Sequence, residues 1–151
     1  MPIVSTTIEI AAAPAKVREI FLDFDSYPEW SKSFFQSIIV TPRKTGEINQ
    51  GDQLKVVLPG ATFKPVVLTN TPSVFCWRGS IPYIFSGDHS FQFNPSQSTP
   101  GHTTFVHGED FSGMLSFLVG PTWSMGKSTR DNYEKYNVEL KARVEGKSFS
   151  G

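Results

Sequence analysis

Apolar and polar residues alternate over the first residues of this chain, and a helical spacing follows. The stretch Ile3–Ile10 predicts a strand, because residues two apart share one face of a strand. Apolar residues at helical spacing then predict a short helix that starts at Pro14, a favoured first helical residue, and ends near Asp25. Tyr27 precedes Pro28, which disfavours continuation, so we expect a turn or a second short helix here.

Short apolar or alternating runs, separated by turn residues, fill the middle of the chain. The expected strands are Phe35–Thr41, Gln53–Leu58, Phe63–Thr69, Val74–Gly79, Asp88–Asn94 and Thr103–Ser112, with Ile81–Ser86 as an apolar loop or short strand. Short runs joined by turns predict antiparallel pairing. The order of strand, two short helices, about six strands and a final helix predicts an α+β fold.

The segment Lys127–Glu145 has a helical period with neither Pro nor Gly inside it. Its apolar stripe consists of Tyr133, Tyr136, Leu140 and Val144. One and two turns earlier the same face carries Thr129 or Arg130 and then Gly126, which are small or polar. A sheet that covers this helix would pack tightly on its second half and leave a gap over its first half, which is a candidate pocket. The alternative is a helix that simply begins late, at a cap on Ser128.

The alternation in two strands turns ionisable side chains toward the core. The inner face of Asp88–Asn94 carries His89 with two phenylalanines, and that of Thr103–Ser112 carries His107 and Glu109 with two more. A buried carboxylate is costly unless it is paired, so these groups need an explanation. They could anchor a ligand or transfer protons in a pocket, or form a structural network in which Glu109 pairs with Arg130 or a histidine. A bulge could instead turn them to solvent.

Composition limits the functions to consider. The 151 residues are most consistent with one domain, residues 1–151, and the formal net charge of +0 does not suggest nucleic acid as a partner. The longest apolar run, Met114–Val119, is too short to span a bilayer, and the first residues do not resemble a signal peptide, so we expect a cytoplasmic protein. Cys76 is the one cysteine, and His107 and Glu109 lack a third ligand nearby in sequence, so no metal is predicted.

Several segments together resemble a known family. They are DSYPEW (25–30), WRG (77–79), FSGDHSF (85–91), TFVHGEDFSG (104–113) and YNVELK (136–141). In this order they resemble the polyketide cyclase/dehydrase-like branch of the START/Bet v 1-like (SRPBCC) superfamily. The resemblance implies a helix-grip fold, in which a curved antiparallel sheet of about seven strands wraps around a long C-terminal helix and encloses an apolar cavity. The sequence departs from the family where Gly120–Pro121 and Gly126 interrupt the helix. The apolar segment Met114–Val119 could then be a lid or a contact for another chain, and our hypothesis is a lid.

The pattern and the resemblance together predict a cavity protein that binds a small hydrophobic or aromatic molecule. In one interpretation it catalyses cyclisation, dehydration or isomerisation without a cofactor, as a lyase or isomerase, with His107, Glu109 and His89 as the acid/base residues. The candidate ligand contacts are Trp77, Phe91, Phe93, Phe105, Phe111, Trp123, Gly126, Arg130 and Tyr133. The alternatives are a non-catalytic carrier or sensor of a hydrophobic metabolite and a protein-interaction module of the same fold. We expect a monomer or a homodimer.

Overall fold

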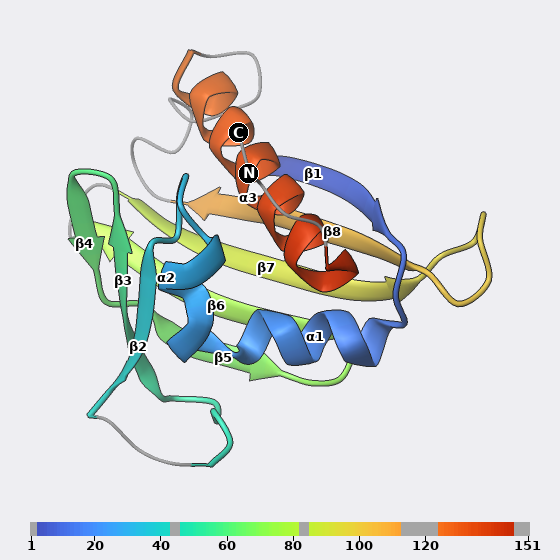
Figure 1. The fold of residues 1–151 in the computed structure, drawn as a ribbon. Helices are drawn as coiled ribbons and strands as arrows, with labels where there is room; N and C mark the ends of the chain where they lie inside the picture. The colour runs from blue at the N-terminus through green and yellow to red at the C-terminus, as the bar shows by residue number, and fades with distance from the viewer. Residues whose placement is uncertain (1–2, 43–45, 82–84, 113–123, 147–151) are drawn as a thin grey trace.

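The computed structural model describes residues 3–42, 46–81, 85–112 and 124–146 (Figure 1). The strands are β1 (Ile3–Ile10), β2 (Ser37–Thr41), β3 (Gln53–Leu58), β4 (Ala61–Phe63), β5 (Val66–Asn70), β6 (Val74–Ile81), β7 (Phe85–Pro95) and β8 (Thr103–Ser112). The helices are α1 (Pro14–Leu22), a 3₁₀ turn (Phe24–Ser26), α2 (Tyr27–Trp30) and α3 (Ser124–Glu145).

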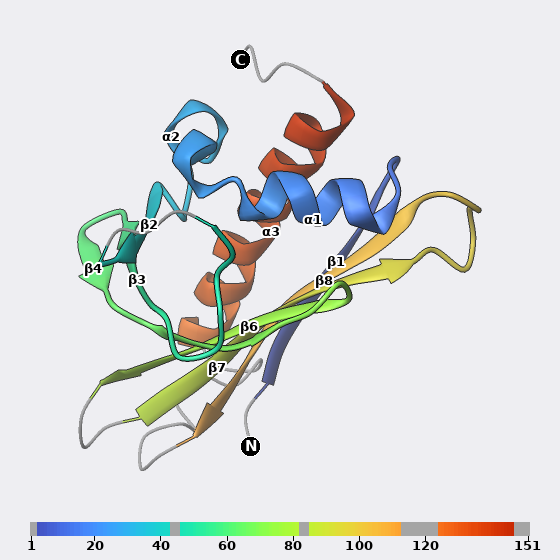
Figure 2. The same ribbon diagram turned by 90° about the horizontal axis from the view of Figure 1, so that it is seen from below.

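The strands form one antiparallel sheet whose order is β1-β8-β7-β6-β5-β3-β2, with β4 paired to β3. The sheet is curved, and α3 lies against its concave face while α1 and α2 cover the same side (Figures 1 and 2). This arrangement confirms the predicted α+β helix-grip fold: seven strands follow the main path, and the short β4 is an addition. No helix in the described part of the chain is long and apolar enough to cross a membrane.

The element bounds differ from the prediction at several places, and the separate loop or strand expected over Ile81–Ser86 is replaced at its ends by the last residue of β6 and the first residues of β7. The single strand expected over Phe63–Thr69 is wrong, because the chain forms β4 and β5 on either side of Lys64–Pro65. Proline has no N–H to donate to a strand ladder, which explains the break. Helix α3 begins at Ser124 rather than Lys127, so Gly126 lies in its first turn. The predicted lid, Met114–Val119, falls outside the described residues.

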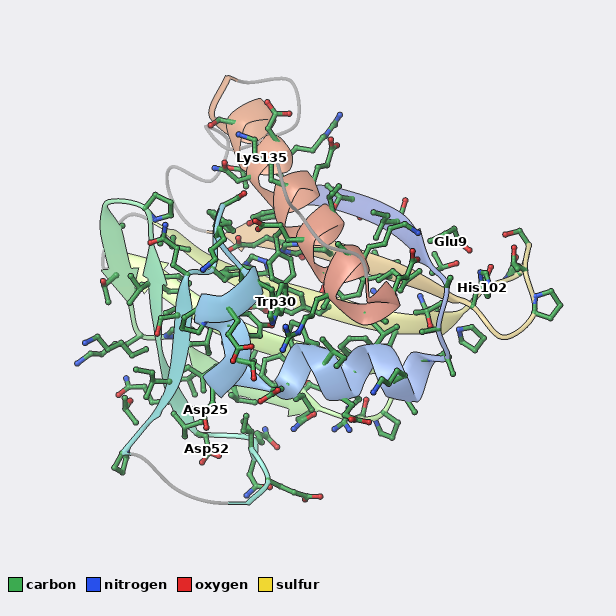
Figure 3. All side chains as sticks on the ribbon, in the orientation of Figure 1. Glu9, Asp25, Trp30, Asp52, His102 and Lys135 are labelled. Atoms are coloured by element: carbon green, nitrogen blue, oxygen red, sulfur yellow. The ribbon has the colours of Figure 1, made fainter. Side chains whose placement is uncertain are left out.

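Two tyrosines fasten the short helices to α3. Tyr27, on α2, donates its hydroxyl proton to the Phe21 carbonyl at 2.8 Å. Its oxygen therefore accepts from the Tyr136 hydroxyl on α3, at 2.7 Å. Both tyrosine side chains are fully buried. Trp30, which is labelled in Figure 3, packs against both rings, with centroids 4.6 Å and 5.8 Å away. The hydroxyl groups thus find partners inside the core and fix the position of α2 against α3.

The core between sheet and helices is dominated by aromatic rings. Phe35, in the segment that enters β2, contacts the rings of Trp77, Phe91 and Tyr136 with centroids 4.9–6.0 Å away. Such edge and tilted contacts are the favoured geometry for aromatic pairs. Phe35 also lies beside His89 and His107, whose ring centroids are 5.5 Å and 5.8 Å from its own. The polar groups of the interior are therefore set in a closely packed aromatic environment.

Candidate functional site

The candidate site lies on the inner face of three neighbouring strands. The register pairs His89 on β7 with Glu109 on β8, and His107 on β8 with Thr6 on β1. Because side chains alternate across a strand, these four residues point to the same side of the sheet, toward α3. His107 is 0% exposed and His89 is 3% exposed, whereas the Glu109 side chain keeps 16% exposure.

The two histidines contact each other directly. Their Nε2 atoms are 2.6 Å apart, which is a hydrogen bond between imidazole rings. Tyr133 of α3 lies over His107 as a stacked ring, with a centroid distance of 4.3 Å and an interplanar angle of 17°. On the other side, Phe91 stacks on His89 at 4.8 Å. The pair is therefore held between aromatic faces and closed off from solvent.

Asn137 of α3 and Thr6 of β1 determine which nitrogen of His107 carries a proton. The Thr6 hydroxyl donates to the His107 carbonyl oxygen at 2.8 Å. Its oxygen is then free to accept from Asn137 Nδ2, also at 2.8 Å. This orients the amide so that Asn137 Oδ1, an acceptor, faces His107 Nδ1 at 2.8 Å. His107 Nδ1 must therefore carry a proton and donate it.

Strand β1 can reach this position because Gly108 leaves room for it. Gly108 pairs with Ser5 in the register of β8 and β1. A Cβ atom at Gly108 would lie 2.6 Å from the carbonyl oxygen of Val4, a separation that real side chains do not adopt. The close approach of the two strands places Thr6 within reach of both the His107 carbonyl and α3.

Glu109 lies at the other end of this group of polar side chains. Its Oε1 accepts a hydrogen bond from the Tyr133 hydroxyl and lies 3.2 Å from His89 Nδ1. The carboxylate rests over the backbone of Gly87: a Cβ atom there would lie 2.8 Å from the carboxyl carbon and nearer still to Oε2. Among the described residues, no hydrogen bond to Oε2 is seen. Within this part of the chain, Oε2 is therefore the Glu109 oxygen open to a further partner.

The hydrogen bonds also fix how many protons this group holds. His107 donates through Nδ1, so a neutral His107 presents Nε2 as an acceptor, and the facing His89 Nε2 must carry a proton. His89 Nδ1 lies 3.2 Å from a carboxylate oxygen of Glu109, and we infer one proton between them as well, because two lone pairs would repel each other at this distance. In the reference state Glu109 is a carboxylate and both imidazoles are neutral. Relative to that state, the two histidines and Glu109 together hold one additional proton. Their net charge is zero, which reduces the cost of burial.

The pKa shifts agree with this arrangement. Burial, followed by the neighbouring charge of His89, holds the pKa of His107 well below its usual value, although the hydrogen bond to Asn137 opposes the shift. Burial, and then the charge of Glu109, raises the pKa of Tyr133 well above its usual value. Tyr133 therefore stays a hydroxyl donor to Glu109, and His107 stays neutral near pH 7.

The predicted site residues fall into three groups. His89, His107, Glu109 and Tyr133 come together as described. Four of the predicted ligand contacts are at most 1% exposed and belong to the packed core: Trp77, Phe91, Phe93 and Phe105. Arg130 is exposed, and Glu109 pairs with His89 rather than with Arg130. Phe111 lies on β8 and Gly126 on α3, and Trp123 falls outside the described residues. Within the described part of the chain, no group of three or more His, Cys, Asp or Glu could hold a metal ion.

Two clefts bounded by described residues lie away from this site. The first, of about 670 Å³, is formed by Arg18 of α1, residues 46–50 and the end of β5. The second, of about 610 Å³, runs along the outer side of α3 beside Lys32 and Val138. Neither is lined by Glu109 or the histidines. The gap predicted over the first turns of α3 stays a prediction.

Sequence patterns missed Thr6 and Asn137. Thr6 lies on the inner face of β1 between Val4 and Ile8, and Asn137 follows Tyr133 by four residues on the buried side of α3. A short polar residue on an otherwise apolar face was the available signal. Their partnership joins positions 131 residues apart in sequence, so no local spacing could reveal it.

Comparison with known proteins agrees with the fold. The family described as "Polyketide cyclase / dehydrase and lipid transport" matches residues 1–145. A START superfamily protein from Mycobacterium smegmatis has a TM-score of 0.69 and 21% identity, covering 97% of this chain and 99% of that one. The hypothetical protein jhp0584 from Helicobacter pylori has a TM-score of 0.74 and 12% identity, with coverages of 94% and 87%. Truncated norcoclaurine synthase from Thalictrum flavum has a TM-score of 0.65 and 11% identity, with coverages of 94% and 92%. At these identities the structural similarity shows the fold alone, and comparison with curated proteins gave no match.

Proposed function

Because the chain belongs to the polyketide cyclase / dehydrase and lipid transport family, we propose that it binds a small hydrophobic or aromatic molecule beside the first turns of α3. Glu109 and Tyr133 are the polar contacts in this proposal. The family and the fold are consistent with binding of a hydrophobic ligand. The aromatic interior around the two residues suits the flat, apolar part of such a molecule.

One observation carries the proposal: the neutral hydrogen-bonded group is sealed at His107 and partly open at Glu109. The histidines are nearly or completely buried, and all four of their ring nitrogens have hydrogen-bond partners or a carboxylate neighbour. Within the described part of the chain Glu109 Oε2 has no hydrogen bond, and the Glu109 side chain is still 16% exposed. A ligand can therefore meet the group at Glu109 without disturbing the histidines. Gly87 keeps the sheet free of side-chain atoms at this point.

The chemistry available at Glu109 is proton transfer. With Glu109 ionised and His89 protonated, the carboxylate can accept a proton from a carbon beside a carbonyl group or from a phenol. An O–H bond then forms at Glu109, and the electron pair of the broken bond stays on the ligand. The resulting anion faces a protonated Glu109–His89 pair and is stabilised by its positive charge. Return of the proton to another ligand atom completes an isomerisation, and its transfer to a leaving hydroxyl group gives water in a dehydration.

A carrier that performs no chemistry is the second candidate, and the saturation of the histidines favours it. A structural hydrogen-bond chain also has every ring nitrogen engaged. In that case the Glu109–Tyr133 pair would orient the polar end of the ligand without moving a proton. The two candidates share the binding site and differ in whether the ligand leaves changed.

The test begins with extraction and native mass spectrometry of the purified protein, to identify a bound small molecule. Glu109→Gln is then compared with Asp110→Asn, which removes a carboxylate from the exposed side of the same strand. We expect the ligand to remain in Asp110→Asn and to be reduced at least tenfold in folded Glu109→Gln. Conversion of the ligand by the wild type but not by Glu109→Gln would identify an enzyme, and binding without conversion a carrier. Equal ligand occupancy in the wild type and Glu109→Gln would contradict the proposed site.

A further inference from the structure

Thr6 and Asn137 form a polar bridge between β1 and α3 that the proposed function does not itself use. Thr6 is 6% exposed and Asn137 is 2% exposed. Burying a polar side chain is costly unless its hydrogen bonds are made. Thr6 and Asn137 form their side-chain hydrogen bonds with each other and with His107. Apolar residues would pack at these positions without that requirement. The bridge therefore needs an account beyond packing.

We propose that Asn137, oriented by Thr6, is a positioning residue that keeps the shared proton of the buried group at the Glu109 end. This inference rests on the proposed function, since it assigns Glu109 as the point where a proton enters or leaves. An amide cannot take up a proton at neutral pH, so the chain ends at Asn137. At the opposite end Glu109 is ionisable and reaches toward solvent. Protons can therefore be exchanged at one end only.

The difference between an amide and a carboxylate decides where the proton is held. His89 lies 3.2 Å from the carboxylate oxygen of Glu109, whereas His107 lies 2.8 Å from the neutral amide oxygen of Asn137. A positive charge is stabilised next to a negative one, so His89 rather than His107 holds the extra proton. His107 then remains a neutral ring that donates through Nδ1 and accepts through Nε2. Its function is to accept the hydrogen bond of His89 Nε2 and so hold that ring with Nδ1 facing Glu109.

Substitution of Asn137 by Asp reverses this arrangement without changing the size of the side chain. A carboxylate at position 137 would favour a positive charge on His107 and draw the shared proton away from His89. Thr6→Val has a different effect: it removes the hydroxyl group that orients Asn137 and keeps the side-chain shape. The amide can then turn, and His107 is no longer restricted to one tautomer. Thr6→Ser retains the hydroxyl group and is the matched control.

The experiment is long-range ¹H–¹⁵N NMR of the histidine rings in the full chain, free of added ligand, near pH 7. In the wild type and in Thr6→Ser, we expect His107 to be neutral with its proton on Nδ1, and His89 to be protonated at Nε2. In Asn137→Asp both nitrogens of His107 should be protonated. In Thr6→Val the Nδ1 and Nε2 signals of His107 should move toward each other as the second tautomer becomes populated. Folding of each variant is checked by the dispersion of its amide spectrum.

A wild-type His107 with its proton on Nε2, or with both nitrogens protonated, would overturn the inference. The inference would also be overturned if Thr6→Val gave a His107 spectrum identical to that of Thr6→Ser. This comparison remains informative even if Asn137→Asp does not fold. The outcome is separate from that of the ligand experiment. If Glu109→Gln does not affect ligand occupancy, the proposed binding site fails while the NMR assignment of the tautomer stands. If the tautomer is wrong, the binding site can still hold.

Discussion

Burial of His107 should give this protein a contribution to stability that is lost on mild acidification. In the folded protein its pKa is held well below 6.5, mainly by burial and then by the charge of His89. In the unfolded chain it titrates near 6.5, so the unfolded state binds an extra proton below that pH. Stability contributed by a group whose folded pKa is lowered in this way is present above pH 6.5 and is lost as the pH falls. With His107 still neutral at about pH 5.5, the loss relative to about pH 7.5 is about 1.4 kcal/mol.

The assay is chemical or thermal unfolding at both pH values for the wild type and for His107→Gln. The wild type should therefore lose about 1.4 kcal/mol more than His107→Gln between these pH values, which for a chain of this size is a difference of about 4 °C in the change of Tm. His107→Gln should be less stable at pH 7.5, because Asn137 and His89 lose their partner, but it should lack the pH-dependent loss. The control is His102→Gln: His102 lies near Glu9 at the turn between β7 and β8, away from the buried group (Figure 3). An equal pH dependence in the wild type and His107→Gln, with His102→Gln unchanged, would refute the assignment of the loss to His107.

Three further predictions concern Glu109 and its neighbours. Gly87→Ala should displace the Glu109 carboxylate and cost about 1–3 kcal/mol of unfolding free energy. Gly79 is the cross-strand partner of Gly87, and Gly79→Ala should cost less, because a Cβ atom there meets only the edge of the Phe63 ring at 3.3 Å. Ligand occupancy should fall in Gly87→Ala alone. Tyr133→Phe removes a hydrogen bond to a charged acceptor and should lower the free energy of unfolding by about 2 kcal/mol. For Tyr136→Phe, which loses a hydrogen bond to the neutral Tyr27, we expect roughly 1 kcal/mol. Equal losses of unfolding free energy in denaturant would contradict an ionised Glu109. In a double-mutant cycle of unfolding free energies, Glu109→Gln and His89→Gln should be coupled by at least about 1 kcal/mol, because Glu109→Gln alone leaves the shared proton without its carboxylate. Additive effects would mean that the two residues do not share a proton.

The sequence was sufficient to predict the fold and the side of the sheet on which the ionisable groups lie. Alternation in Asp88–Asn94 and Thr103–Ser112 placed His89, His107 and Glu109 inward, and the structure buries both histidines there. Periodicity works in these strands because one face is covered by α3 and the other faces solvent. It was insufficient at Phe63–Thr69, where Pro65 ends one pairing and the chain begins another.

The partners of the inward groups could not be predicted in the same way. The sequence left open whether Glu109 pairs with Arg130 or with a histidine, since both lie within reach of a strand that faces a helix. The choice depends on register and on the rotation of α3, which places Tyr133 and Asn137 over the sheet and Arg130 toward solvent. These are long-range features of packing. A pattern within one strand or one helix contains no information about them.

The two ends of the buried group bear on the choice between a structural network and a site. A purely structural chain of hydrogen bonds has no need of an ionisable residue at its more exposed end, because a neutral amide such as Asn137 satisfies a histidine equally well. An ionised Glu109 instead obliges the interior to hold a compensating proton on His89, and such buried ion pairs are often no more stable than apolar packing. The sealed end shows that this fold can close such a chain with neutral groups. A carboxylate at the open end, with one oxygen that accepts no hydrogen bond from the described residues, fits the proposed role toward a ligand better than a contribution to stability.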